Sequence, residues 1–213
     1  MKIKAAIFDW DGTITDSNSI KTEAFIEIFK DSHHNTAEYI RSYQQSNGGI
    51  SRFEKYRHYI RHFFHHEVSE ADLKTFAQRY SKLCKEKLLQ APFIPGAVET
   101  LQKLKQNNIP SFIVTGSPAE EIRELAAARN LLQLITNIYG SPQTKNILLN
   151  KLLQEHKLQA TETVFFGDSI TDYNAAQINN IPFIGICLNK NFSPFPQKTT
   201  VLNHIHIDFD KKN

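Results

Sequence analysis

The chain has 213 residues, 40% of them apolar and 22% charged, and a net charge of +3 from 25 basic and 22 acidic side chains. This composition excludes a long disordered tract, and without a Lys/Arg block no nucleic-acid partner is required by charge. Cys84 and Cys187 lie far apart in the sequence, which argues against a disulfide framework and a zinc knuckle. The sequence has neither a signal-peptide core nor an apolar stretch of membrane-spanning length, so we expect a cytoplasmic protein that does not enter a membrane.

The first predicted strand, residues 3–8 ("IKAAIF"), is followed at once by two carboxylates. Asp9 and Asp11 are two positions apart, so in an extended chain both side chains face the same way, and Gly12 then lets the backbone turn. Paired carboxylates repel each other unless a cation or a shared proton relieves the repulsion, which points to metal binding or acid/base chemistry. An ordinary turn at a strand end is the alternative that this stretch leaves open.

The next part of the chain contains no convincing strand and carries amphipathic helical patterns. We expect a helical cap domain at residues 17–91, inserted into a catalytic core made of residues 1–16 and 92–213, because the helical block separates the first strand from all others. The turn-forming stretch "APFIPG" fits the second crossing between the two domains. The predicted cap helices span residues 19–30, 35–46, 51–66 and 69–90.

The cap stretch "GGISRFEK" carries the candidate residues for reading the substrate. Gly48 and Gly49 permit a turn that approaches the site closely, while Arg52 and Lys55 could grip a carboxylate or a sugar group. The alternative is an ordinary helix start with Ser51 as its N-cap.

Three histidines, His58, His62 and His66, recur every fourth residue in the third cap helix and so share one helical face. Such a face could hold zinc or nickel, but no carboxylate joins it at regular spacing apart from Glu67. We therefore expect a solvated cap surface here.

In the last part of the chain, short β-branched or aromatic runs alternate with helical patterns. Two of these helices begin with capping boxes, Ser117-x-x-Glu120 and Ser169-x-x-Asp172. Together with the first strand, this alternation predicts an α/β fold with a doubly wound, parallel, five-stranded Rossmann-like sheet. The predicted strands are residues 111–114, 134–139, 163–166 and 181–186, with a weaker final strand at 201–209, and the predicted helices are residues 117–130, 144–157 and 169–180.

Polar side chains directly follow two strands of this predicted sheet. Thr115, Gly116 and Ser117 come after the second strand, and Asp168 and Asp172 come after the fourth. Because the carboxyl ends of neighbouring parallel strands share one crevice, we expect these residues to meet the paired aspartates of the first strand there.

The four aspartates at this crevice predict a metal site. Clustered carboxylates need a hard divalent cation, and oxygen ligands without Cys or His favour Mg²⁺. Thr115 and the amides that follow it form an anion seat, and Lys145 at the next helix start can supply positive charge. Together these parts describe a phosphoryl group held against Mg²⁺ beside an aspartate nucleophile.

With these motifs in place, the sequence resembles the haloacid dehalogenase superfamily of phosphotransferases over nearly its whole length. The four motifs of that family are similar to "DWDGT", "TGS", Lys145 and "GDSITD", which occur here in the same order. The inserted helices resemble the C1-type cap of phosphoglycolate phosphatase-like and β-phosphoglucomutase-like members.

The resemblance implies a role for each site residue. It implies that Asp9 is the nucleophile that becomes an aspartyl phosphate and that also binds Mg²⁺. Asp11 would protonate the leaving oxygen, later deprotonate the attacking water, and ligate the metal through its backbone carbonyl. Asp168 would complete the metal ligands, with Asp172 supporting the metal waters or the lysine. The residues implied for binding phosphate oxygens are Thr115, Gly116, Ser117 and Lys145.

The expected function is Mg²⁺-dependent hydrolysis of a small-molecule phosphomonoester. Asp11 is present where members that break carbon–halogen bonds lack an acid, so the resemblance points to phosphoester chemistry. Mutases of the β-phosphoglucomutase type carry a histidine where this chain has Lys21, which disfavours that alternative. A catalytically silent binding or regulatory module is the second alternative. The expected partner is a small phosphorylated metabolite, and the sequence leaves its identity and the oligomeric state open.

Overall fold

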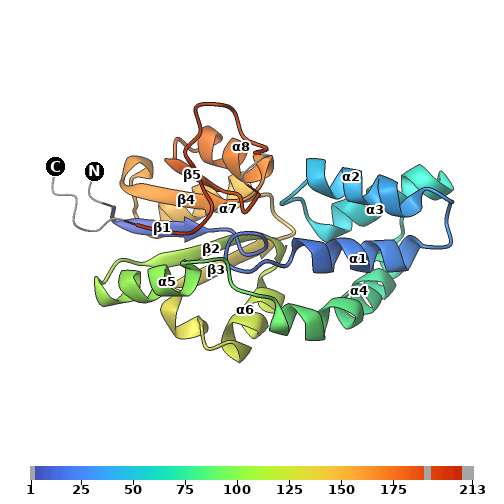
Figure 1. Cartoon of the computed structure of the whole chain (residues 1–213), viewed down its shortest axis with the longest axis horizontal. Helices are drawn as coiled ribbons and strands as arrows, with labels where there is room; N and C mark the ends of the chain where they lie inside the picture. Colours follow the sequence, from blue (N-terminus) through green and yellow to red (C-terminus); the bar gives the residue numbers. More distant parts are fainter. Residues whose placement is uncertain (1–2, 190–192, 208–213) are drawn as a thin grey trace.

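The computed structural model of the chain describes residues 3–189 and 193–207 and shows a parallel sheet beside a group of helices (Figure 1). Strand β1 (Ala5–Phe8) lies in the middle of the sheet, whose strand order is β3-β2-β1-β4-β5-β6. All pairings are parallel, so the carboxyl ends of the strands lie at one edge. The other strands are β2 (Ser111–Pro118), β3 (Asn137–Ser141), β4 (Thr163–Gly167), β5 (Phe183–Ile186) and β6 (Val201–Leu202).

Both faces of the sheet are covered, as in a doubly wound fold. Ala5 and Ile7 of β1 pack against α7 (Lys145–Glu155) and α8 (Ile170–Ile178). The alternate residues Ala6 and Phe8 face α5 (Ala97–Gln106) and α6 (Ala119–Ala128) on the opposite side. This alternation buries apolar side chains on both faces of a parallel sheet. The predicted α/β architecture is confirmed, while helix α5 was not predicted.

The sheet has six strands where five were predicted, and the sixth is shorter than the weak strand expected at 201–209. Pairing with β5 stops at Leu202 because the chain then turns to α5: the Ile205 amide donates to the Pro95 carbonyl at 2.8 Å. Thr100 Oγ1 donates to the Ile205 carbonyl at 3.2 Å, which holds this segment off the sheet. Residues 208 and 209 lie outside the described residues.

The strand expected at residues 134–139 begins later, at Asn137. Residues Leu132–Leu134 form a short 3-10 helix, η1, instead. The turn is fixed from β2, because Ser111 Oγ donates to the Leu134 carbonyl and the Ser111 carbonyl accepts from the Thr136 amide. A second 3-10 helix, η2 (Ala160–Glu162), precedes β4.

The helical block that follows β1 lies beyond the carboxyl ends of the strands (Figure 1). Aromatic side chains form its interior: the Phe25 ring centroid lies 5.2 Å from that of Tyr59 and 4.9 Å from that of Tyr80. Among the described residues, no helix is long and apolar enough to cross a membrane. The helices of the block are α1 (Asn18–Phe29), α2 (Thr36–Ser46), α3 (Arg52–Phe64) and α4 (Glu70–Gln90). We call this block the cap, and its predicted boundaries at residues 17 and 91 stay a prediction.

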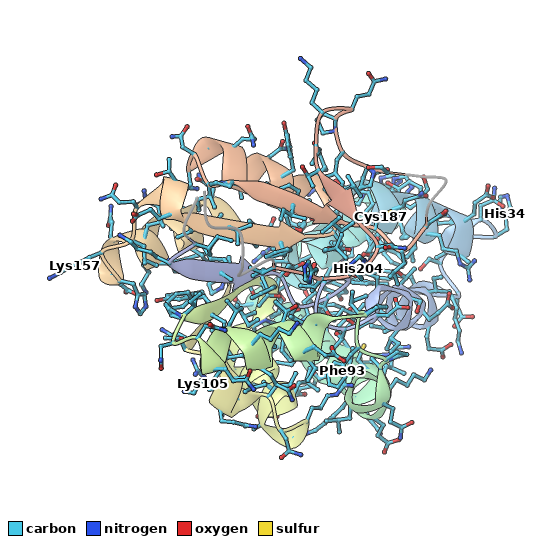
Figure 2. The ribbon with its side chains drawn as sticks, turned by 60° about the vertical axis from the view of Figure 1, so that its left-hand side comes forward. His34, Phe93, Lys105, Lys157, Cys187 and His204 are labelled. Atoms are coloured by element: carbon cyan, nitrogen blue, oxygen red, sulfur yellow. The ribbon has the colours of Figure 1, made fainter. Side chains whose placement is uncertain are left out.

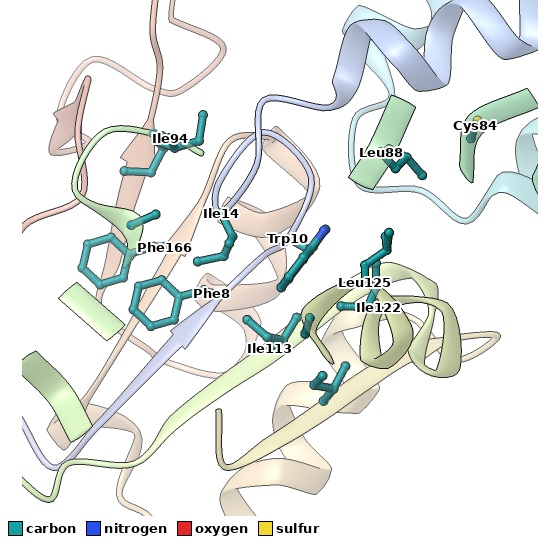
Figure 3. Packing of buried hydrophobic residues seen from close by; sticks show 14 of the residues in the cluster. Phe8, Trp10, Ile14, Cys84, Leu88, Ile94, Ile113, Ile122, Leu125 and Phe166 are labelled. Atoms are coloured by element: carbon teal, nitrogen blue, oxygen red, sulfur yellow. The ribbon is translucent and has the colours of Figure 1, made fainter. Parts of the chain in front are cut away.

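The two chain segments that join cap and core run side by side. The Ile94 amide donates to the Ile14 carbonyl at 3.0 Å, and Thr15 bridges Phe93 in antiparallel fashion. Phe93 is partly buried at this joint (Figure 2), while Trp10 is fully buried next to Ile14 (Figure 3). Trp10 therefore belongs to the packing at the joint.

The predicted solvated histidine face holds for His62 and His66, which are exposed, whereas His58 is partly buried. The His62 and Tyr39 rings stack with centroids 3.8 Å apart, and the His58 and Tyr43 rings stack at 3.9 Å. The Tyr39 hydroxyl also lies 2.8 Å from His58 Nε2. The histidines of α3 thus interleave with tyrosines of α2, and no metal-ligand group of the described residues includes them.

This stack predicts how the stability of the protein depends on pH. Burial, reinforced by nearby His62 and Arg61, lowers the pKa of His58 below its ordinary value of 6.5. The unfolded chain therefore binds more protons at this residue just below that pH, so stability that is present above it is lost as pH falls. We expect the melting temperature of the unmodified protein to fall relative to that of a His58→Phe variant between about pH 7.5 and 5.5.

The matched control is His34→Phe, which replaces an exposed histidine at the far end of the cap (Figure 2). Its melting temperature should follow that of the unmodified protein across the pH series. A melting-temperature difference between the His58→Phe variant and the unmodified protein that stays constant across the pH series would contradict this account.

Candidate active site

Three carboxylates converge at the carboxyl ends of β1 and β4. Asp9 directly follows β1, and its amide donates to the Phe166 carbonyl of β4 at 2.9 Å. Asp168 directly follows β4, and Asp172 lies in the first turn of α8. One oxygen of each carboxylate lies within 4.8 Å of the other two. The parallel order of the sheet thus brings together acids that are far apart in the sequence.

Lys145 is the cation of this cluster. It is the first residue of α7, it is buried, and its Nζ lies 2.9 Å from Asp9 Oδ1 and 2.5 Å from Asp172 Oδ1. The second oxygen of Asp172 accepts from the amide and hydroxyl of Ser169. The capping box predicted for α8 is therefore present, and its acidic member also holds the lysine.

The electrostatics of the cluster show an excess of negative charge. Burial raises the pKa of Asp9 well above its ordinary value, a rise that Lys145 opposes and the neighbouring aspartates reinforce. Burial and the charge of Asp172 raise the pKa of Asp168 to about 7. A group of carboxylate oxygens with too little positive charge among them fits a hard divalent cation.

A glycine lets the chain pass close to this cluster. Gly12 has a φ of +77°, and a Cβ atom there would overlap the carboxylate of Asp168. Only glycine adopts this backbone conformation without strain. The turn carries the chain to Asn18 at the start of the cap, whose Nδ2 donates to Asp168 Oδ2 at 2.6 Å.

Asp11 lines the same cavity, but its carboxylate is not part of the cluster. Its Oδ1 accepts from Ser17 Oγ at 2.6 Å, and its Oδ2 accepts from Lys21 Nζ and from Ser117 Oγ. Burial alone would raise the pKa of Asp11, but the Lys21 ammonium and these hydrogen bonds lower it. No local pattern in the sequence marks Ser17 as a partner of Asp11, and Lys21 stands out there only as a departure from the mutase pattern.

The predicted anion seat lies at an irregular end of β2. The pairing of β2 with β3 shifts register between Val114 and Pro118, so the regular ladder is interrupted at Thr115 and Gly116. Bulges of this kind are frequent next to active sites. The capping box predicted at Ser117 is wrong: helix α6 follows Pro118 without a side-chain cap, because the Ser117 hydroxyl instead donates to the carboxylate of Asp11.

The predicted substrate loop of the cap lies against these core residues. The Gly48 carbonyl accepts from Thr171 Oγ1 of α8 at 2.7 Å. Gly49 has a φ of +76°, and a Cβ atom there would lie 2.8 Å from Ser169 Oγ and 3.1 Å from Lys145 Nζ. Ser51 also caps α3, so the helix start and the site loop are the same segment.

Cap and core enclose a cavity of about 820 Å³, a volume suited to a small molecule. Arg52 lines it but is already paired, with Nη1 2.6 Å from Glu121 Oε2 of α6. Lys55 is 8% exposed, and its Nζ donates to Gln44 Oε1 at 2.5 Å. Burial and the nearby charge of Lys21 lower the pKa of Lys55 to about 8. The predicted site residues that line the cavity are Asp9, Asp11, Arg52, Lys55, Thr115, Gly116, Ser117 and Asp168.

Comparisons with known proteins agree with this geometry. The model of the haloacid dehalogenase-like hydrolase family matches residues 6–186. Phosphoglycolate phosphatase of Photobacterium profundum is 31% identical over 108 residues, which cover 48% of this chain and 47% of the relative. Phosphoglycolate phosphatase of Yersinia pseudotuberculosis is 24% identical over 200 residues, which cover 89% of this chain and 83% of the relative. A crystal structure of a predicted phosphoglycolate phosphatase from Haemophilus somnus has a TM-score of 0.69 at 20% identity, covering 87% of this chain and 86% of that one.

The match over residues 6–186 shows that the chain belongs to the haloacid dehalogenase-like hydrolase family. The likeness to the solved structure shows the same fold. The prediction of a hydrolase in the phosphatase branch of this family is confirmed.

Proposed function

We propose that the protein is a Mg²⁺-dependent phosphatase that hydrolyses a small phosphomonoester through an aspartyl-phosphate intermediate. The observation that carries the proposal is the cluster of Asp9, Asp168 and Asp172 around Lys145, beside the irregular end of β2. The names of the relatives, which are phosphoglycolate phosphatases, support a small phosphorylated substrate. The cytoplasmic location expected from the sequence stays a prediction.

The residues present fit Mg²⁺, because the clustered donors are carboxylate oxygens with an excess of negative charge. The proposed ligands are the carboxylates of Asp9 and Asp168 and the backbone carbonyl of Asp11, with Asp172 holding Lys145 and supporting the metal waters. When bound, the metal would neutralise these acids and the oxygens of the phosphoryl group.

The proposed reaction has two phosphoryl transfers. In the first, a carboxylate oxygen of Asp9 attacks phosphorus, the ester P–O bond breaks, and the leaving oxygen takes a proton from Asp11. In the second, Asp11 takes a proton from a water whose oxygen attacks the same phosphorus, which releases inorganic phosphate and frees Asp9. Lys145, Thr115 and the amides that follow Thr115 hold the phosphate oxygens during both transfers.

Lys55 suggests what the rest of the substrate carries. Among the cations that line the cavity, Lys21, Arg41 and Arg52 each pair with a carboxylate of the described chain. The Lys55 ammonium instead donates to the neutral side-chain amide of Gln44. A buried ammonium without a carboxylate partner favours an anionic ligand. We therefore propose that the ester carries a carboxylate and that this carboxylate binds Lys55. Arg52, which lines the same cavity, would contribute to binding the carboxylate through its nearby positive charge.

The first prediction concerns the nucleophile and the metal. An Asp9→Asn variant should lose hydrolysis of p-nitrophenyl phosphate by at least about 1000-fold, because an amide cannot form the phosphorylated intermediate. EDTA should abolish the rate of the unmodified protein, and added Mg²⁺ should restore it. The control is Asp31→Asn, an exposed acid at the end of α1, which should keep the full rate. Full activity in Asp9→Asn would contradict the proposal, and an unmodified protein with no EDTA-sensitive rate would favour the silent binding module.

The second prediction concerns the substrate. We expect Lys55→Met to raise KM for phosphoglycolate by about ten- to a hundredfold, because a charge-assisted hydrogen bond contributes about 1.5–3 kcal/mol. KM for 2-hydroxyethyl phosphate, which lacks the carboxylate, should change little.

The same lysine should shape the pH profile of the unmodified enzyme. Because the pKa of Lys55 is about 8, kcat/KM for phosphoglycolate should fall above that pH relative to kcat/KM for 2-hydroxyethyl phosphate, which has no carboxylate. Equal effects of Lys55→Met on the two esters would contradict the assignment of a carboxylate site.

A further inference from the structure

We infer that Lys21 is a positioning residue for Asp11, and that it lets the cap fix the carboxyl group that transfers protons. The inference rests on the proposed function and extends it, since Lys21 has no role in the reaction described above. The inference rests on a contact between the cap and the core. Lys21 lies in the first helix of the cap, whereas Asp11 lies in the turn that follows β1.

The contacts of Lys21 hold the Asp11 carboxylate from the cap side. Lys21 Nζ donates both to Asp11 Oδ2 and to Ser117 Oγ, the latter at 2.7 Å, and Ser117 Oγ lies 3.1 Å from the same Asp11 oxygen. Ser17 Oγ holds the other carboxylate oxygen at 2.6 Å. The Asp11 carboxyl group is thus oriented by three side chains from two segments, the start of α1 and the end of β2, and Lys21 is the one that carries a charge.

The position of Lys21 is itself fixed by the cap. Its backbone carbonyl accepts from the hydroxyl of Tyr80 in α4 at 3.4 Å, and its side chain is only 15% exposed. Tyr80 is buried against Phe25 in the aromatic interior of the cap. A shift of the cap would therefore move the ammonium group away from Asp11.

The charge of Lys21 also opposes a specific repulsion. Asp9 and Asp168 lie in the same cavity as Asp11 and bear the same charge when ionised. Without the ammonium, the Asp11 carboxylate would be repelled from this cluster, and only the hydroxyls of Ser17 and Ser117 would oppose its displacement. A misplaced Asp11 would fail chiefly where a proton must reach the leaving oxygen, since proton transfer needs hydrogen-bond contact.

The test compares esters that differ in their need for that proton. Nitrophenolate leaves without protonation, whereas an alkoxide needs a proton to leave. Loss of Asp11 positioning should therefore lower the rate of hydrolysis far more for alkyl esters than for p-nitrophenyl phosphate. We expect Lys21→Met to lower kcat/KM for 2-hydroxyethyl phosphate by about 100-fold and kcat/KM for p-nitrophenyl phosphate by less than about fivefold. Both assays use the whole chain with Mg²⁺, and thermal unfolding checks that the variant is folded.

A double-mutant comparison shows whether Lys21 acts through Asp11. In an Asp11→Asn background, Lys21→Met should cause no further loss with the alkyl ester. The control is Lys30→Met at the end of the same helix, whose ammonium pairs with the exposed Glu27 and which should leave both esters unaffected. If Lys21→Met does not fold, Lys21→Gln, which keeps a hydrogen-bond donor, carries the same comparison.

Two results would overturn the inference. One is an equal loss with both esters, which is the result expected of a merely structural ion pair. The other is a further loss of the same size in the Asp11→Asn background. If the unmodified protein hydrolyses neither ester with Mg²⁺, the proposed function fails instead, and this inference falls with it.

Discussion

The ion pairs of Lys145 with Asp9 and Asp172 are the interaction on which the rest of the site depends. Uncompensated charges buried among apolar strands cost several kcal/mol each, so the two fully buried acids need a cation beside them. The three residues come from β1, α7 and α8, and only a parallel sheet with this strand order brings those elements to one edge. The fold and the charge balance therefore constrain each other, and the remaining excess of negative charge suits the proposed metal ion.

The cap completes a site that the core alone leaves open. Gly49 can pass within contact distance of Lys145 because it has no side chain, and Asn18 reaches Asp168 through the turn at Gly12. On the proposed assignment, Lys55 faces the part of the substrate that is not phosphate and Lys21 holds the carboxyl group that moves protons. Substrate selection and proton transfer would then both depend on how the cap is seated on the core.

The meeting of the acids and the lysine at one edge of the sheet could be predicted from the sequence, because strand ends in a parallel sheet have a fixed meeting place. Asp9, Asp168 and Lys145 follow from that rule and from the motif spacing. Their roles in catalysis stay a prediction. The pairing of Lys21 with Asp11 could not be predicted, since it depends on how the cap folds back over the turn. Ser117 was predicted to cap a helix, because the local pattern Ser-Pro-Ala-Glu is the same whether the serine hydroxyl caps that helix or bonds to Asp11. The stacking of His58 and His62 depends on tyrosines from another helix, which periodicity within one helix does not reveal.

The central claim is that Asp9 carries the phosphoryl group during turnover. The most direct measurement is rapid acid quenching of the enzyme during hydrolysis of a phosphomonoester with Mg²⁺, followed by peptide mass spectrometry to locate the phosphorylated residue. The account predicts a transient, acid-stable but base-labile acyl phosphate on Asp9, formed only with substrate present. Phosphate found on another residue would contradict this claim. So would turnover without any phosphorylated peptide under conditions in which the intermediate forms faster than it is hydrolysed.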